Sequence, residues 1–133
     1  QNSQGKLWAI AIERPKLSVD ESEGFDWVID LDNQAMATSG DYRSYFEIDG
    51  NIFSHEIDPR TGYPSRTGVA SATVIAPKCT DADALATALM LMPITDGLKL
   101  VESIPKTEAF IIIRQPEDRF SYRQSSGINV KPY

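Results

Sequence analysis

Two helical segments set among short strand-like runs are the feature of the sequence that most constrains its fold. The spacing of apolar residues predicts a helix over Asp81–Met92, with Thr80 as its N-cap and Asp83 three residues further on in a capping-box position. A second helix is expected over residues 95–103, because Pro105 cannot continue it. The helices therefore form one pair late in the chain, and shorter apolar runs precede and follow them.

The shorter apolar runs predict strands. They cover residues 7–12, 27–31, 34–38, 69–75, 109–114 and 120–123. A β-hairpin is expected where Tyr42–Ile48 and Asn51–Ser54 flank Asp49-Gly50, a favoured two-residue turn. Residues 17–24 and 58–64 are expected to be loops, the second one stiffened by two prolines. This order of elements predicts an α+β fold, with helices covering one side of a mixed or antiparallel sheet.

Length, charge and residue counts limit what the chain can do. Its 133 residues fit a single domain over residues 1–133. A net charge of −6 argues against general nucleic-acid binding, because phosphates call for a basic surface. One cysteine excludes an internal disulfide, and one histidine excludes a two-histidine metal site. The chain opens at Gln1 without a signal peptide, so we expect a processed chain or part of something longer.

Asp83 and Thr87 lie one turn apart on the first predicted helix. The apolar face predicted by helical spacing consists of Leu85, Ala88, Leu89 and Met92. Further apolar residues flank the opposite side, so we expect a helix buried nearly all round, on which a carboxylate and a hydroxyl need partners. Mg²⁺ would be such a partner, because it takes oxygen ligands and often binds substrate phosphates as well. Alternatively, Asp83 satisfies backbone N–H groups at the helix start, and Thr87 bonds back to the carbonyl one turn earlier.

His55 is the one histidine of the chain and lies where a hairpin strand meets the stiff loop. Its unperturbed pKa near neutrality suits it to proton transfer, and catalytic residues favour loops held by a scaffold. The alternative is a histidine that hydrogen-bonds the loop backbone and holds Asp58-Pro59 in place. The neighbouring Asp58 and Arg60 are expected to pair with each other.

Thr38, Ser39 and Gly40 form a third candidate segment. Two hydroxyls and a glycine let the backbone approach a ligand closely, as in loops that cradle phosphate, although such runs also occur in ordinary turns. Cys79 precedes a helix N-terminus, but without a second cysteine we interpret it as structural.

Three blocks of sequence follow one another in a recognisable order and spacing: Ala37–Arg43 (ATSGDYR), Ser54–Pro64 (SHEIDPRTGYP) and Thr80–Ala88 (TDADALATA). Together they resemble the FAD:protein FMN transferases, the ApbE family, formerly called thiamine-biosynthesis lipoproteins. The opening residues Gly5–Pro15 also resemble a strand from the middle of that family's chain. The resemblance implies an ApbE-like flavin transferase domain, of which residues 1–133 would form the C-terminal portion.

The resemblance also implies an activity and a location. Members are bacterial, exported enzymes, often lipid-anchored to the inner membrane in the periplasm. With Mg²⁺ they split FAD at its pyrophosphate, attach FMN to a Thr or Ser of an acceptor protein and release AMP. Typical acceptors are subunits of membrane redox complexes. Carried over by residue, His55 matches the histidine proposed as catalytic, Asp83 and Thr87 match the residues that bind Mg²⁺, and the segments Thr38-Ser39-Gly40 and His55-Glu56 match regions that line the FAD site.

Two departures from the family keep other functions open. Family members are much longer, so we expect that an N-terminal half, or else a second copy of the chain, covers apolar surface here. Glu56 stands where the family commonly has an apolar residue, and its charge would repel phosphate if the side chain faced the ligand. The alternatives are a FAD-binding module without transferase activity, a FAD pyrophosphatase that yields FMN and AMP, and a purely structural domain.

Overall fold

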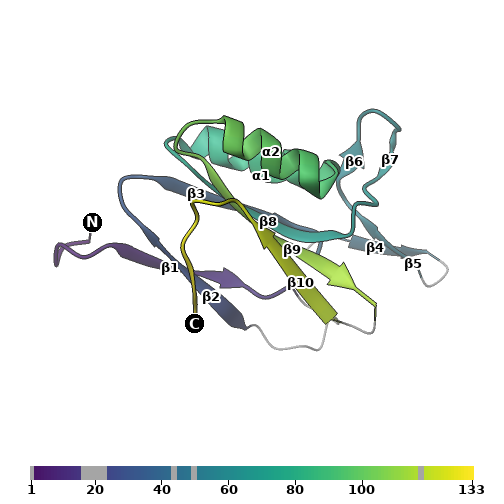
Figure 1. The fold of residues 1–133 in the computed structure, drawn as a ribbon. Coiled ribbons are helices and arrows are strands. Elements are labelled where there is room, and N and C mark those ends of the chain that lie inside the picture. The colour runs from purple at the N-terminus through teal and green to yellow at the C-terminus, as the bar shows by residue number, and fades with distance from the viewer. Residues whose placement is uncertain (1, 16–23, 43–44, 49–50, 117–118) are drawn as a thin grey trace.

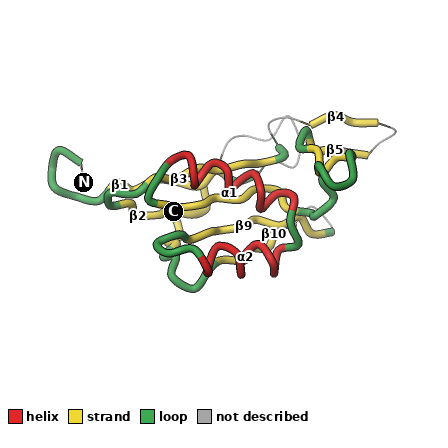
Figure 2. Tube along the Cα trace, turned by 90° about the horizontal axis from the view of Figure 1, so that it is seen from above, coloured by secondary structure: helices red, strands yellow, loops and turns green. Residues whose placement is uncertain are grey.

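Two antiparallel sheets and a pair of helices form three layers in the computed structural model (Figures 1 and 2). The structure describes residues 2–15, 24–42, 45–48, 51–116 and 119–133. The helices lie on one face of a four-stranded sheet, called here the central sheet. A three-stranded sheet, called here the outer sheet, packs on its other face. The predicted α+β class, with helices on one side of an antiparallel sheet, is confirmed.

The central sheet has the strand order β10-β9-β8-β3. Its strands are β3 (Ala35–Gly40), β8 (Val69–Ala76), β9 (Glu108–Gln115) and β10 (Arg119–Gln124). The outer sheet has the order β1-β2-β11, with strands β1 (Trp8–Glu13), β2 (Phe25–Leu31) and β11 (Val130–Pro132). Two small hairpins join β4 (Tyr45–Ile48) to β5 (Asn51–Ser54) and β6 (Ile57–Asp58) to β7 (Tyr63–Pro64). The helices are α1 (Cys79–Leu91) and α2 (Ile94–Ser103).

The core has two parts, one on each face of the central sheet. All eight residues of β8 are buried, as expected for a strand covered on both sides. Val74 belongs to the cluster under the helices, whereas its neighbour Ile75 belongs to the cluster against the outer sheet. The helix-side cluster is rich in alanine, so α1 approaches β3 and β8 closely. Close packing also joins the helices, since a Cβ on Gly97 of α2 would lie 2.5 Å from Cδ2 of Leu89 on α1.

The start of α1 differs from its prediction. The helix begins at Cys79, and its N-cap Lys78 makes no side-chain capping bond. Thr80 is therefore already inside the first turn, and its hydroxyl lies 3.5 Å from a carboxylate oxygen of Asp81. The predicted capping box with Asp83 is wrong, because an N-cap residue must have non-helical backbone angles. Cys79 itself is exposed.

Most predicted strands are present, with boundaries moved by one or two residues, although the first hairpin strand begins at Tyr45 rather than Tyr42. The exceptions are β11, which the sequence analysis missed, and the short β6–β7 pairing inside the expected loop 58–64. The predicted loop over residues 17–24 and the turn at Asp49-Gly50 lie largely or wholly outside the described residues. Nevertheless, the pairing of Ile48 with Asn51 confirms the hairpin.

Candidate active site

The face of α1 that carries Asp83 and Thr87 is exposed. The residues buried beneath the helix are Ala82, Ala86, Leu89 and Met90. The expectation of a helix buried nearly all round is therefore wrong. Of the predicted apolar face, Leu89 is buried and Leu85 packs against the core, whereas Ala88 and Met92 are only partly buried. The alanines of the helix pack on a sheet face that is itself lined with small side chains. The size of the apolar side chains therefore did not decide which side of the helix faces the sheet. Burial consequently gives no reason for Asp83 and Thr87 to need a partner.

The exposed pair still presents the oxygen atoms that a hard cation takes. Within the part of the chain that the structure describes, the Asp83 carboxylate has no hydrogen-bond or ion-pair partner. The Thr87 hydroxyl donates a long bond to the Asp83 carbonyl, 3.3 Å away, which is the local bond considered as an alternative. One of its lone pairs can then accept from Ser39, which leaves the other for a cation. One carboxylate and one hydroxyl fit Mg²⁺, which would complete its shell from water, phosphate or other oxygens.

No group of three or more His, Cys, Asp or Glu side chains that could hold a metal occurs among the described residues. The described part of the chain therefore offers a partial site rather than a closed cage of protein ligands. Such a site suits a cation that is shared with a phosphorylated substrate.

Ser39 brings the first sequence block to the third. Its hydroxyl lies 3.1 Å from the hydroxyl of Thr87, although the two residues are 48 positions apart. This contact arises because β3 is the edge strand beneath α1 and Ser39 points toward the helix. The comparison of this segment with a phosphate-cradling loop is wrong in form, since the strand predicted to end at Thr38 continues through Ser39 and Gly40 as β3.

Thr38 points to the other face of the same strand, because successive side chains alternate. Its hydroxyl lies 2.8 Å from that of Thr73 on β8. Thr38 and Gly40 line a cavity of about 390 Å³ between β3 and the outer sheet, and Glu13 and Tyr42 contribute to it. The side chains of the predicted ligand-binding segment therefore lie on two opposite faces of the central sheet. Ser39 belongs to the α1 side, whereas Thr38 belongs to the opposite side.

His55 lies on the surface between β5 and β6, where the second sequence block begins. Its neighbour Glu56 is buried and only 9% exposed. The hydroxyl of Ser54 donates to a carboxylate oxygen of Glu56 at 2.7 Å, and Ser65 N–H donates to the Glu56 carbonyl at 2.9 Å. The side chain of Glu56 is thus buried and held by the chain itself.

The stiff loop after His55 is organised by an ion pair. Arg60 donates to Asp58 through Nε, at 2.9 Å, and through Nη2, at 2.8 Å. These side-chain hydrogen bonds, with a backbone bond and the guanidinium charge, lower the pKa of the Asp58 carboxyl below its ordinary value of 3.8. The same pairing raises the pKa of Arg60. The expected Asp58–Arg60 pair is confirmed, and it stays charged at neutral pH.

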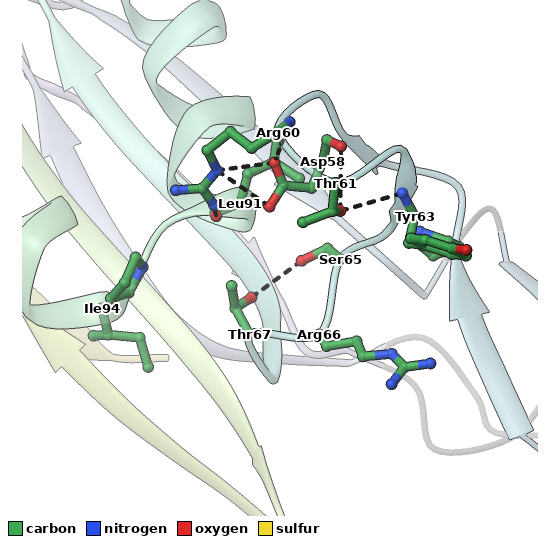
Figure 3. Close-up of a pocket in the computed structure, with 11 residues that line it drawn as sticks. Asp58, Arg60, Thr61, Tyr63, Ser65, Arg66, Thr67, Leu91 and Ile94 are labelled. Atoms are coloured by element: carbon green, nitrogen blue, oxygen red, sulfur yellow. Dashed lines mark hydrogen bonds and ion pairs between the residues drawn. The ribbon is translucent and has the colours of Figure 1, made fainter.

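A groove of about 630 Å³ lies between this loop and the junction of the two helices (Figure 3). It is lined by Asp58, Arg60, Thr61, Tyr63, Pro64, Ser65, Arg66, Thr67, Leu91, Pro93 and Ile94. The first members of this set belong to the loop predicted over residues 58–64, whereas Ser65, Thr67 and the helix ends were not predicted from the sequence. Their roles depend on contacts with α1, and no local pattern signals such contacts.

The three sequence blocks thus meet around one helix. Ser39 of the first block contacts Thr87 of the third, and Arg60 of the second donates to the carbonyl of Leu91, one turn further along α1. The structure gives no direct contact between His55 and Asp83, so their joint role stays a prediction.

Comparison with known proteins agrees with this arrangement. A family model described as the ApbE family matches residues 1–111. The chain is 44% identical to an FAD:protein FMN transferase of Haemophilus influenzae, over 96% of this chain and 36% of that protein. It is 42% identical to one of Vibrio cholerae, over 99% of this chain and 37% of that protein. The chain therefore spans little more than a third of the length of these curated relatives.

Solved structures give the same result. The crystal structure of the ApbE protein of Thermotoga maritima is 36% identical with a TM-score of 0.73, covering 91% of this chain and 37% of the other. The flavin transferase ApbE of Vibrio cholerae is 38% identical with a TM-score of 0.71, covering 94% of this chain and 38% of the other. Sequence, fold and the meeting of the three blocks around α1 all lead to one conclusion: the chain belongs to the ApbE family.

Proposed function

We propose that this chain is the part of an FAD:protein FMN transferase that holds Mg²⁺ and accepts the proton. The reaction transfers FMN from FAD to a Thr or Ser hydroxyl of an acceptor protein and releases AMP. The single observation that carries the proposal is the exposed Asp83–Thr87 face of α1, which Ser39 of another sequence block contacts. The names of the relatives support the same activity.

Asp83 and Thr87 are the residues that would hold the metal. When bound, Mg²⁺ would neutralise charge on the diphosphate oxygens as the leaving phosphate departs. Asp83 supplies a carboxylate whose oxygens have no partner in the described part of the chain. Ser39 contacts the hydroxyl of Thr87 and holds it in place. These residues bind and orient, and they need no covalent intermediate on the enzyme.

His55 would act as the general base. The acceptor oxygen forms a bond to the FMN phosphorus, the bond from that phosphorus to the bridging oxygen of FAD breaks, and AMP leaves with the bridging oxygen. The proton of the acceptor hydroxyl goes to the imidazole of His55, which is exposed and so accessible to a protein substrate. Such proton transfer typically contributes a rate factor of about 10²–10⁴.

Several residues predicted to line the FAD site take different places in this proposal. Ser39 contacts Thr87, one of the two residues that would hold the metal. Thr38 and Gly40 instead line the cavity on the other face of β3. Glu56 is buried, and its carboxylate accepts a hydrogen bond from Ser54 at 2.7 Å, which keeps it from turning freely toward a ligand. The repulsion of phosphate considered from the sequence is therefore reduced.

The acceptor and the cellular location follow from the family resemblance. We propose a subunit of a membrane redox complex as the acceptor, and the bacterial periplasm, with a lipid anchor on the inner membrane, as the location. Neither described helix, α1 or α2, has the length and hydropathy needed to cross a bilayer.

The test incubates the protein that carries these 133 residues with FAD, Mg²⁺ and an acceptor domain. Flavin fluorescence of the acceptor band on a denaturing gel is measured together with released AMP. We expect labelled acceptor and AMP in equal amounts. AMP without labelling would indicate a pyrophosphatase, and FAD binding without AMP would indicate a binding module. No change in melting temperature with FAD plus Mg²⁺ would indicate a structural domain.

A further inference from the structure

The C-terminal end of α1 is bound by side chains from the second sequence block. The last carbonyls of any helix lack partners within the helix, and the last turn of α1 contains no basic residue. Arg60 Nη2 donates to the carbonyl of Leu91 at 2.7 Å. The hydroxyls of Ser65 and Thr67 both donate to the carbonyl of Met90, at 2.7 and 2.8 Å. We call these three side chains, shown in Figure 3, the helix clamp.

The guanidinium of Arg60 binds two partners at once. It forks onto the carboxylate of Asp58 while Nη2 also reaches Leu91 on the helix. A positive group at a helix C-terminus also interacts favourably with the helix dipole. The loop around it is held by backbone bonds to the Asp58 carbonyl, from Thr61 at 3.1 Å and from Gly62 at 2.8 Å. Hydrogen bonds therefore join the loop and the helix end into one unit.

The position of this unit matters because of what lies at its two ends. His55 precedes Asp58 by three residues on the loop, and Thr87 precedes Leu91 by one turn on the helix. The two segments are linked by a hydrogen bond across 31 positions of sequence. Any shift of the loop along the helix would therefore change the distance between the imidazole and the Asp83–Thr87 face.

We propose that the helix clamp positions His55 relative to the metal-binding face of α1, with Arg60 as its principal positioning residue. This inference rests on the function proposed above, and it concerns residues that act through others rather than on the substrate. Lysine cannot replace Arg60 fully, because a single ammonium does not reproduce the planar fork that binds Asp58 and Leu91 at once.

The first experiment compares Arg60→Gln, Arg60→Lys and Arg66→Gln by steady-state kinetics of acceptor labelling. Arg66 is exposed, lines the same groove and takes no part in the clamp, so its variant controls for lost charge. We expect kcat to fall about 10- to 100-fold in Arg60→Gln, since a misplacement of about 1 Å near the chemistry has effects of this size. We expect the KM for FAD to stay within about threefold, and Arg60→Lys to recover part of kcat.

A second pair of variants separates a role in positioning His55 from a role in stabilising the fold. Thr67→Val removes the hydroxyl that binds Met90 while keeping the side-chain shape, and Thr67→Ser keeps the hydroxyl. We expect kcat to fall in Thr67→Val and to be restored in Thr67→Ser, with rates measured well below both melting temperatures. This pair decides the question if Arg60→Gln does not fold.

Three results would overturn the inference. The first is a kcat of Arg60→Gln equal to that of the unaltered protein or of Arg66→Gln. The second is a loss of activity that disappears on cooling, and the third is equal activity of Thr67→Val and Thr67→Ser. Failure of the proposed function has a different signature, because Asp83→Asn would then retain full activity whatever the clamp variants do.

Discussion

Replacement of Asp83 by Asn should separate activity from stability. Asp83 is exposed and makes no hydrogen bond or ion pair within the described part of the chain. It lies beyond the first turn of α1, where the helix dipole has little effect, and Asp and Asn have similar helix propensities. We therefore expect the free energy of unfolding to change by no more than about 0.5 kcal/mol. With an unfolding entropy of about 2.1 cal/mol/K per residue, this corresponds to a shift in Tm of about 2 °C.

The effect on transfer should be far larger. A metal ion that stabilises charge on a transferring phosphate contributes several kcal/mol, and each 1.36 kcal/mol changes a rate about tenfold. We therefore expect flavin transfer to fall by about 10²–10⁴-fold at fixed Mg²⁺. The assay measures initial rates of acceptor fluorescence and AMP release over a range of Mg²⁺ concentrations. Thermal unfolding of the same samples is followed by circular dichroism.

Asp81→Asn is the matched control. Asp81 is also exposed, lies two residues earlier on the same helix and points in a different direction, so its variant removes the same charge away from Thr87. The reasoning would be refuted if Asp83→Asn kept its rate within about threefold of the unaltered protein, or if Asp81→Asn lost as much activity. A Tm lowered by much more than about 2 °C would show that Asp83 has a structural role.

Three further predictions follow from particular contacts. His55→Ala should lower transfer by about 10²–10⁴-fold while FAD still binds, which labelling and FAD titration measure together; full labelling would remove its role as a base. Gly97→Ala should destabilise the protein by about 1–2 kcal/mol in urea unfolding, because its Cβ would lie 2.5 Å from Cδ2 of the buried Leu89, and the cost of shifting this methyl exceeds the gain in helix propensity of about 1 kcal/mol; an unchanged midpoint would contradict this packing. The lowered pKa of Asp58 means that its pairing with Arg60 stabilises the fold above the unfolded value near 3.8 and ceases to do so as pH falls through the folded value. Asp58→Asn should therefore lower Tm at pH 7, and the difference should shrink as pH falls below about 4; a pH-independent difference would be evidence against the pair.

The sequence alone predicted the kinds of element and much of their order. Several elements lie close to where they were expected. They include the helix over residues 81–92, the strands over 69–75 and 109–114, and the hairpin at residues 42–54. These predictions succeed because periodicity, proline positions and turn residues act within a few positions of the chain. The three sequence blocks were also visible, since each is a run of adjacent residues.

Only the tertiary structure decided which sides of these elements face one another. Helical spacing could not show that α1 turns Ala82 and Ala86 inward and leaves Asp83 exposed, because that choice depends on the alanine-lined sheet beneath it. Strand alternation could not show that Ser39 reaches Thr87, because the contact needs β3 to lie at the sheet edge under α1. Local patterns determine the elements, whereas contacts across tens of residues determine the site, and those contacts exist only once the layers have packed.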